Sequence, residues 1–172
     1  MINLIEKNLV NIAEETISIC NDGWYKNSKG ESVNVSLAIK NSQEETFSLA
    51  PGMVFPNSVF VDKQLKTKFH ILDMETLRAA RQFSKEDVCV LNFASAKKPG
   101  GNFLSGAIGQ EENICRCSGL YSCISKSPMY CYDLMTKDGT YSDYMIYSPD
   151  VPVFRDGSYN LLEEPYFCSF NW

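Results

Sequence analysis

The chain has 172 residues, of which 44% are hydrophobic and 22% charged, and its formal net charge at pH 7 is −5. This length suits one domain with a sizeable core, and no apolar run approaches the length of a membrane span. The acidic balance argues against a protein held on nucleic acid by a general basic surface, but it is compatible with a nucleotide gripped by backbone amides. Residues 1–7 contain an early acid and no small-residue cleavage site, which argues against a secretion signal and predicts a cytoplasmic location.

The amino-terminal part is expected to form a helix and then a hairpin. Apolar residues recur at helical spacing over residues 3–20, and Asn21-Asp22-Gly23 predicts the end of that helix. In residues 24–35, apolar residues stand on both sides of a turn and alternate with polar ones after it, which is typical of a small hairpin. A short helix is expected near residues 37–43, and the proline-interrupted residues 46–60 are expected to be irregular.

The central part alternates between strand and helix patterns. Residues 68–72 predict a strand, and Asp73 is expected to cap a helix over residues 75–83. Residues 88–93 form a continuous apolar run, the kind found in strands buried on both faces. After a glycine-rich loop, residues 111–125 predict one helix.

The last part is tyrosine-rich. Short strands are expected at residues 145–147 and 151–154, and Asp156-Gly157 predicts a turn. The succession of strand, helix, strand, loop and helix predicts an α/β fold in which helices cover a sheet. No repeat or linker interrupts the chain, so residues 1–172 are expected to form a single domain in which residues 1–60 are an amino-terminal helical and hairpin extension.

The cysteine pattern favours buried, reduced thiols. There are seven cysteines, with no Cys-x-x-Cys pair, and the lone His70 is far from most of them in sequence. A structural zinc site needs a second ligand pair, which is not visible here, so no metal is expected.

Residues 99–112 are the most informative segment, because four of the ten glycines lie between positions 100 and 109. Glycines between a strand and a helix let the backbone approach a ligand closely, most often a phosphate. Gly101 and Gly106 have the spacing of a Walker-type loop, but neither the lysine nor the hydroxyl residue follows. A tight connection without a ligand is the alternative.

Two carboxylates, Glu111 and Glu112, end this segment at the expected start of a helix. Acids in a first helical turn complement the helix dipole, and this is one interpretation of the pair. The other is acid catalysis. A helix start lowers the pKa of a carboxyl group, so a general acid there needs burial, a neighbouring charge or an anionic ligand to keep its proton.

The same segment is similar to a known signature. Gly-Gly-x, seven residues and then Gln-Glu-Glu resembles the motif of poly(ADP-ribose) glycohydrolases. Residues 92–96, 115–121 and 146–156 resemble the microbial branch of that family, and the resemblance covers essentially the whole chain. It implies a macrodomain-like mixed sheet flanked by helices, with an amino-terminal helical extension and ADP-ribose in a cleft at one end.

The resemblance also implies a mechanism. Glu112 would protonate the glycosidic oxygen between two riboses and then activate water, while Glu111 would bond ribose hydroxyls and orient the sugar. No cofactor and no metal are implied. The implied ligand-binding residues are Asn92, Ala94, Gly100, Gly101, Asn102 and Gln110, with the loop amides beside the diphosphate and the distal ribose.

Two departures from the family pattern bear on function. The third glycine is replaced by Asn102, which tolerates positive φ but is expected to place its side chain where the ligand passes. Relatives also continue beyond a segment like residues 164–167 with further strands and a second phosphate loop, so the domain is expected to be incomplete at its carboxyl-terminal end. An open sheet edge would then favour self-association or a partner.

Three hypotheses follow. The protein is a glycohydrolase that cleaves ribose–ribose bonds of poly(ADP-ribose) and releases ADP-ribose. Alternatively, it is an inactive, truncated macrodomain that binds ADP-ribose, an ADP-ribosylated protein or another protein partner. The third hypothesis is a fragment that a second copy or another chain completes.

Overall fold

A computed structural model describes residues 4–53, 66–136 and 141–172. Helix α1 (Leu4–Asp22) ends as the sequence indicates, at Gly23, which has a φ of +76° and donates its N–H to the Ile19 carbonyl at 2.9 Å. Strands β1 (Trp24–Lys26) and β2 (Ser32–Asn34) form the predicted antiparallel hairpin. The predicted short helix follows as α2 (Ser36–Glu45).

The main sheet has the strand order β3-β5-β6-β4. It consists of β3 (Phe47–Leu49), β4 (Cys89–Leu91), β5 (Met145–Arg155) and β6 (Leu161–Asn171). β4 is parallel to β6, whereas the β3–β5 and β5–β6 pairs are antiparallel. The predicted α/β fold with a mixed sheet is therefore confirmed.

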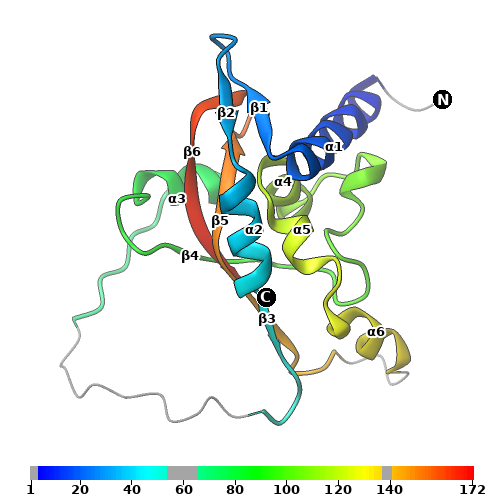
Figure 1. Ribbon diagram of the computed structural model, residues 1–172. Coiled ribbons are helices and arrows are strands. Elements are labelled where there is room, and N and C mark those ends of the chain that lie inside the picture. The colour runs from blue at the N-terminus through cyan, green and yellow to red at the C-terminus, as the bar shows by residue number, and fades with distance from the viewer. Residues whose placement is uncertain (1–3, 54–65, 137–140) are drawn as a thin grey trace.

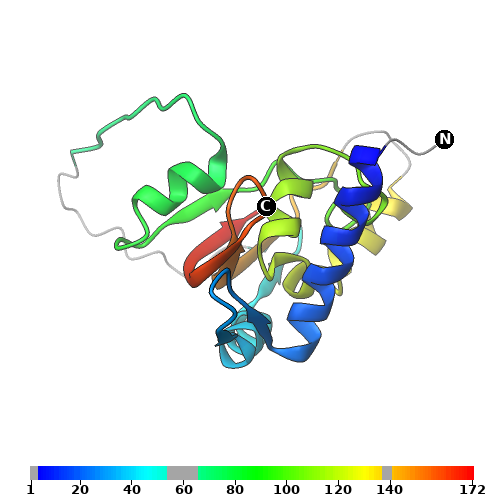
Figure 2. The ribbon, with the colours of Figure 1, turned by 90° about the horizontal axis from the view of Figure 1, so that it is seen from above.

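The remaining helices pack around this sheet (Figure 1). They are α3 (Thr76–Gln82), the short 3₁₀ helix η1 (Phe103–Ser105), α4 (Gln110–Cys117), α5 (Leu120–Ile124) and α6 (Pro128–Met135). Helices α4 and α5 contact β5, and α1 lies along α4, as Figure 2 shows from above. None of the helices in the described ranges is both long and apolar enough to cross a membrane.

Two apolar clusters hold the layers together. The larger one joins α4 and α5 to the sheet and includes Ile114, Leu120, Ile146 and Phe170. The smaller one surrounds Phe154 of β5 with side chains from α1, β1, the residue before α2, and α2: Ile19, Tyr25, Val35 and Ile39. Because these side chains pack directly on a sheet strand and β3 joins the sheet itself, much of the amino-terminal extension is part of the fold's core.

One strand prediction is wrong, and another holds only in part. Residues 68–72 have no regular structure, and Phe69 and Ile71 are 90% and 99% exposed, since no strand of the described residues pairs with them. Residues 88–93 give only the three-residue β4, in which Val90 is buried but Cys89 and Leu91 are exposed. β4 is the last strand in the sheet order, and it is not covered on both faces.

The predicted helix over residues 111–125 is interrupted. Ser118 adopts an extended conformation and forms an isolated bridge to Val153, and Gly119 donates its N–H to the Pro152 carbonyl at 3.0 Å. These contacts to β5 end α4 and start α5 in a new direction. The helix predicted over residues 75–83 is present as α3, but Glu75 and not Asp73 occupies its N-cap.

The two short strands predicted at 145–147 and 151–154 are one strand, β5. A shift in register between Ser148 and Val151 accommodates Pro149 and Asp150, and Asp150 has a φ of +45°. Such a bulge bends a strand without ending it. The expected turn at Asp156-Gly157 is present, whereas α6, β3 and β6 were not predicted from the sequence.

Candidate functional site

The glycine loop runs from the end of β4 to the start of α4, and Glu111 of α4 bonds two residues in the first half of this segment. One carboxylate oxygen of Glu111 accepts the N–H of Ser95 at 2.8 Å, and the other accepts the N–H of Gly100 at 3.1 Å. Only 3% of Glu111 is exposed. The first carboxylate of the pair therefore supports the loop from inside.

Burial raises the pKa of the Glu111 carboxyl group above its ordinary value. The N–H bonds from Ser95 and Gly100 oppose this shift, and the charge of Glu112 adds to it. The two acids are thus held in different environments, one inside the protein and the other partly open to solvent.

Glu112 lies in a notch between two glycines. Its Oε1 accepts the N–H of Asn102 at 3.1 Å. A Cβ added to Gly101 would lie 2.9 Å from the Glu112 carboxyl carbon, and one added to Gly109 would lie 3.3 Å from it. Gly101 also has a φ of +58°, which favours glycine. The glycines therefore make room for this carboxylate.

The loop amides already have partners inside the chain. Gly100 and Asn102 donate to the two glutamates, Gly101 donates to the Lys98 carbonyl at 3.0 Å, and Phe103 donates to the Gly100 carbonyl at 3.2 Å. In this structure the segment supports carboxylates and leaves no N–H group of residues 100–103 free for a phosphate.

Gln110 occupies the free edge of β4. Its side-chain oxygen accepts the N–H of Phe93 at 2.7 Å, and its amide nitrogen donates to the Leu91 carbonyl at 2.8 Å and to Thr76 Oγ1 at 3.4 Å. One side-chain amide thus takes the place of a peptide unit from a neighbouring strand. This fixes the start of α4, and with it the two glutamates, against the sheet.

Asn102 does not adopt the left-handed conformation expected of the glycine it replaces. Its φ is −111° and its ψ is 30°, which any residue can adopt. Its exposed side chain accepts a hydrogen bond from the Lys98 ammonium group. The change from glycine therefore needs no backbone strain here.

An open groove begins beside Asn92 and Ala94, two of the residues implied by the resemblance. Its volume is about 570 Å³, and it is lined by Asn92, Phe93, Ala94, Asp143, Tyr144, Met145 and Trp172. Asn92 is 5% exposed, and its side-chain oxygen has no hydrogen-bond partner among the described residues. The lining of the groove thus combines aromatic and polar residues, a mixture common in small-molecule sites.

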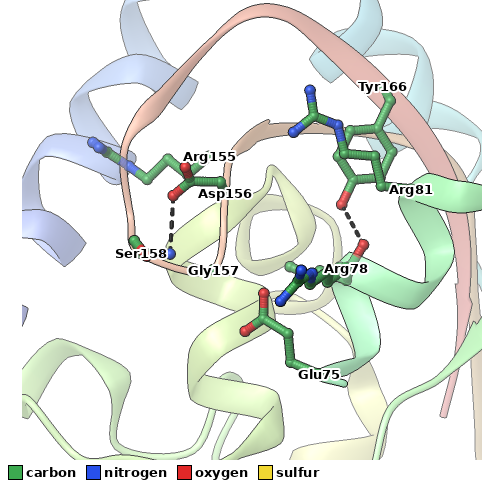
Figure 3. A pocket seen from close by; sticks show the side chains of 9 residues that line it. Glu75, Arg78, Arg81, Arg155, Asp156, Gly157, Ser158 and Tyr166 are labelled. Atoms are coloured by element: carbon green, nitrogen blue, oxygen red, sulfur yellow. Dashed lines mark hydrogen bonds between the residues drawn. The ribbon is translucent and has the colours of Figure 1, made fainter. Parts of the chain in front are cut away.

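A second pocket, of about 490 Å³, lies between α3 and the β5–β6 turn (Figure 3). Arg78 and Arg81 lie on one side of it and Asp156 on the other, with Glu75 below Arg78 in the view. Tyr166 donates to the Leu77 carbonyl at 2.9 Å. None of the residues predicted from the sequence lines this pocket, and its mixed charges favour no single class of ligand.

The cysteines do not form a metal site within the described ranges, where no three metal-ligating side chains come together. All seven thiols are free, and four of them are buried. Burial raises the pKa of Cys117 to about 12, so this thiol is unreactive at neutral pH.

The structure brings Gly100, Gly101, Asn102, Glu111 and Glu112 into direct contact and places Gln110 beside them. Asn92 and Ala94 lie in the adjoining groove. Sequence reasoning missed Ser95 and Lys98, whose contacts depend on the folded loop.

Comparison with known proteins gives the family. The model of the microbial-type PARG catalytic domain matches residues 13–156. Poly(ADP-ribose) glycohydrolase from Thermomonospora curvata, bound to the inhibitor ADP-HPD, has a TM-score of 0.85 at 36% identity, over 96% of this chain and 62% of that one. The Deinococcus radiodurans enzyme in complex with ADP-ribose has a TM-score of 0.67 at 31% identity, over 77% of this chain and 56% of that one. Among curated proteins, none matches.

The chain therefore spans less than two thirds of the length of these solved relatives. The family match covers most of it, including the glycine loop and both glutamates. This chain belongs to the microbial-type poly(ADP-ribose) glycohydrolase family.

Proposed function

We propose that the protein hydrolyses ribose–ribose O-glycosidic bonds of poly(ADP-ribose) and releases ADP-ribose, with Glu112 as general acid and base. The observation that carries this proposal is the placement of Glu112. Its carboxylate is partly exposed, bonded by the Asn102 N–H and set between Gly101 and Gly109, so that a sugar can approach it closely.

The two glutamates take different roles in this proposal. Glu112 donates its proton to the departing ribose oxygen, an oxocarbenium-like sugar forms, and the carboxylate then takes a proton from the attacking water. Each carboxylate oxygen of Glu111 accepts one N–H group of the loop, and its remaining lone pairs accept hydrogen bonds from ribose hydroxyls. An anion beside a carboxyl group favours its protonated form, so the substrate diphosphate helps the acid keep its proton.

The substrate class is proposed on two grounds. Family relatives bind ADP-ribose or the inhibitor ADP-HPD. In this chain, the groove at Asn92 and Ala94 offers room for a nucleoside next to the glycine loop. Gly100 and Gly101 have no side chain, so they let the diphosphate and distal ribose approach the backbone closely. Their own N–H groups are already bonded inside the chain and are not the groups that bind the ligand.

An inactive macrodomain that binds ADP-ribose or a protein partner is the second candidate, favoured by Asn102 at the position of the third glycine of the family motif. Self-association through an open sheet edge is a further prediction of the resemblance, and light scattering of the purified protein tests it. A monomer over a wide concentration range would argue against it.

Glu112→Gln separates the two candidates. The amide keeps the shape of the carboxyl group but has no proton to donate, so hydrolysis of poly(ADP-ribose) should fall by about 10²–10⁴-fold while ADP-ribose binding measured by calorimetry stays within about threefold. Equal, negligible turnover by both proteins with intact binding would support the inactive module. Loss of binding in parallel with activity would refute the role of Glu112.

A further inference from the structure

Arg116, in the last turn of α4, is a buried cation without a carboxylate partner. It is 0% exposed, and none of the ion pairs in the described residues includes it. A charge in the core destabilises a protein unless its donors are bonded. Here Nε and Nη2 donate to main-chain carbonyls, whereas Nη1 has no hydrogen-bond partner among the described residues. The function of this side chain therefore depends on which segments those carbonyls belong to.

Two of those carbonyls belong to the glycine loop. Nη2 of Arg116 donates to the Phe103 carbonyl at 2.9 Å and to the Ala107 carbonyl at 2.6 Å. These residues lie on either side of Gly106. Because the guanidinium group is planar and rigid, it fixes both carbonyls relative to α4.

The first part of the loop is bonded to the same helix by the two glutamates. Gly100 donates to Glu111 and Asn102 donates to Glu112. Residues 100–107 are therefore attached to α4 at both ends, by carboxylates from its first turn and by a guanidinium group from its last.

Helix α1 completes this support. Nε of Arg116 donates to the Leu9 carbonyl at 3.4 Å, and the Arg116 carbonyl accepts the Thr16 hydroxyl at 2.6 Å. Figure 1 shows α1 lying beside α4. The amino-terminal helix thus contacts the same residue that holds the loop.

We propose that Arg116 is the positioning residue of the glycine loop: by fixing the Phe103 and Ala107 carbonyls, it keeps the Asn102 N–H on Glu112 and the notch at Gly101 open. Only the activity readout of this inference rests on the proposed function. The geometry of the loop can be tested without it.

The test compares Arg116→Lys and Arg116→Met with the control Arg78→Met, which removes an exposed side chain without a hydrogen bond in the described part of the chain. Hydrogen exchange is followed at the Gly106 and Ala107 amides, which bond to the Phe103 and Asn102 carbonyls. Exchange there should become about 10- to 100-fold faster in both Arg116 variants, while the amides of α2 change by less than about twofold. The control should leave both regions unchanged.

A residue that only stabilises the core would speed exchange by the same factor in α2 and in the loop, and this result would overturn the inference. If neither variant folds, the wild-type protein decides. Its loop amides should then open together with those of α4, and loop opening about 100-fold more frequent than that of α4 would overturn the proposal.

Activity is measured on the same proteins. The kcat for poly(ADP-ribose) should fall by at least about tenfold in both variants, with Arg116→Lys the less affected because it keeps one donor. Faster loop exchange in the Arg116 variants, combined with no hydrolase activity in the wild-type protein, would refute the proposed function but leave the role of Arg116 intact. Lost activity in the Arg116 variants with unchanged loop exchange would refute the positioning role of Arg116 but leave the proposed function intact.

Discussion

Gly101→Ala tests whether the glycine loop exists to accommodate the acid. The new Cβ would lie 2.9 Å from the Glu112 carboxyl carbon and 3.3 Å from Oε2 of Glu111, and Gly101 has a φ of +58°. The left-handed conformation costs an alanine about 1–2 kcal/mol. Displacing the partly exposed Glu112 breaks its bond from Asn102, which adds about 1 kcal/mol once water replaces part of that bond.

A matched control separates these two costs. Gly30, in the β1–β2 turn, has a φ of +79°, and a Cβ there meets no atom within 4 Å. Gly30→Ala should therefore lose only the conformational part, about 1–2 kcal/mol, and keep full activity. Gly101→Ala should lose about 1 kcal/mol more and reduce kcat/KM by about 10²-fold, since a shift of about 1 Å in a catalytic group has that effect.

The assay is urea unfolding of the single and double variants together with hydrolysis of poly(ADP-ribose). In a Glu112→Ala background the contact with Glu112 is removed and only that with Glu111 remains, so the cost of Gly101→Ala should fall toward that of Gly30→Ala. The reasoning is refuted if Gly101→Ala costs the same with and without Glu112, or if the single variant retains wild-type activity.

Three further predictions follow from the same site. Because the folded-state pKa of Glu111 is raised, the folded protein binds this proton more tightly than the unfolded chain. The stability of the wild-type protein relative to Glu111→Gln should therefore rise as pH falls from 7 toward the ordinary pKa of 4.5. A pH-independent difference between the two proteins in urea unfolding would contradict this. Gln110→Ala should lower the free energy of unfolding by about 1–2 kcal/mol and speed hydrogen exchange of the Phe93 amide. Gln110→Glu still accepts that N–H, so this amide should exchange more slowly than in Gln110→Ala. Equal exchange in both variants would argue against the edge contact. Asn102→Gly should tighten ADP-ribose binding in calorimetry if its side chain faces the ligand, with Lys98→Met as the control that removes only its partner; unchanged affinity places the side chain outside the cleft.

The sequence predicted those features that local signals determine. Gly23 ends α1 because a left-handed residue there closes the helix, and the β1–β2 hairpin follows from its own turn. The adjacency of the glycine loop and Glu111-Glu112 was equally visible, since the two glutamates directly follow the loop in the sequence. Each of these depends on contacts within a few residues.

The features that were missed depend on distant partners. Residues 68–72 have an apolar strand pattern, but nothing in the described fold pairs with them. β6 contains Pro165 and two glutamates, and its strand conformation is stabilised by β5 and by the remote β4. The contact of Gln110 with the β4 edge and that of Arg116 with the loop carbonyls likewise join parts of the chain that no periodicity relates.

The strand order of the sheet has a consequence for how the protein folds. Among the described strands of the main sheet, only β5 and β6 form a local hairpin, whereas β4 pairs Cys89 with Ser169, and β3 pairs Phe47 with Tyr147. Pairings between such remote segments pay a large loop-closure entropy before they are stabilised, so they form slowly. The β5–β6 hairpin should therefore gain protection first in pulsed hydrogen exchange during refolding, and β4 last. The glycine loop starts where β4 ends, and the two glutamates would reach their final positions only in that last step.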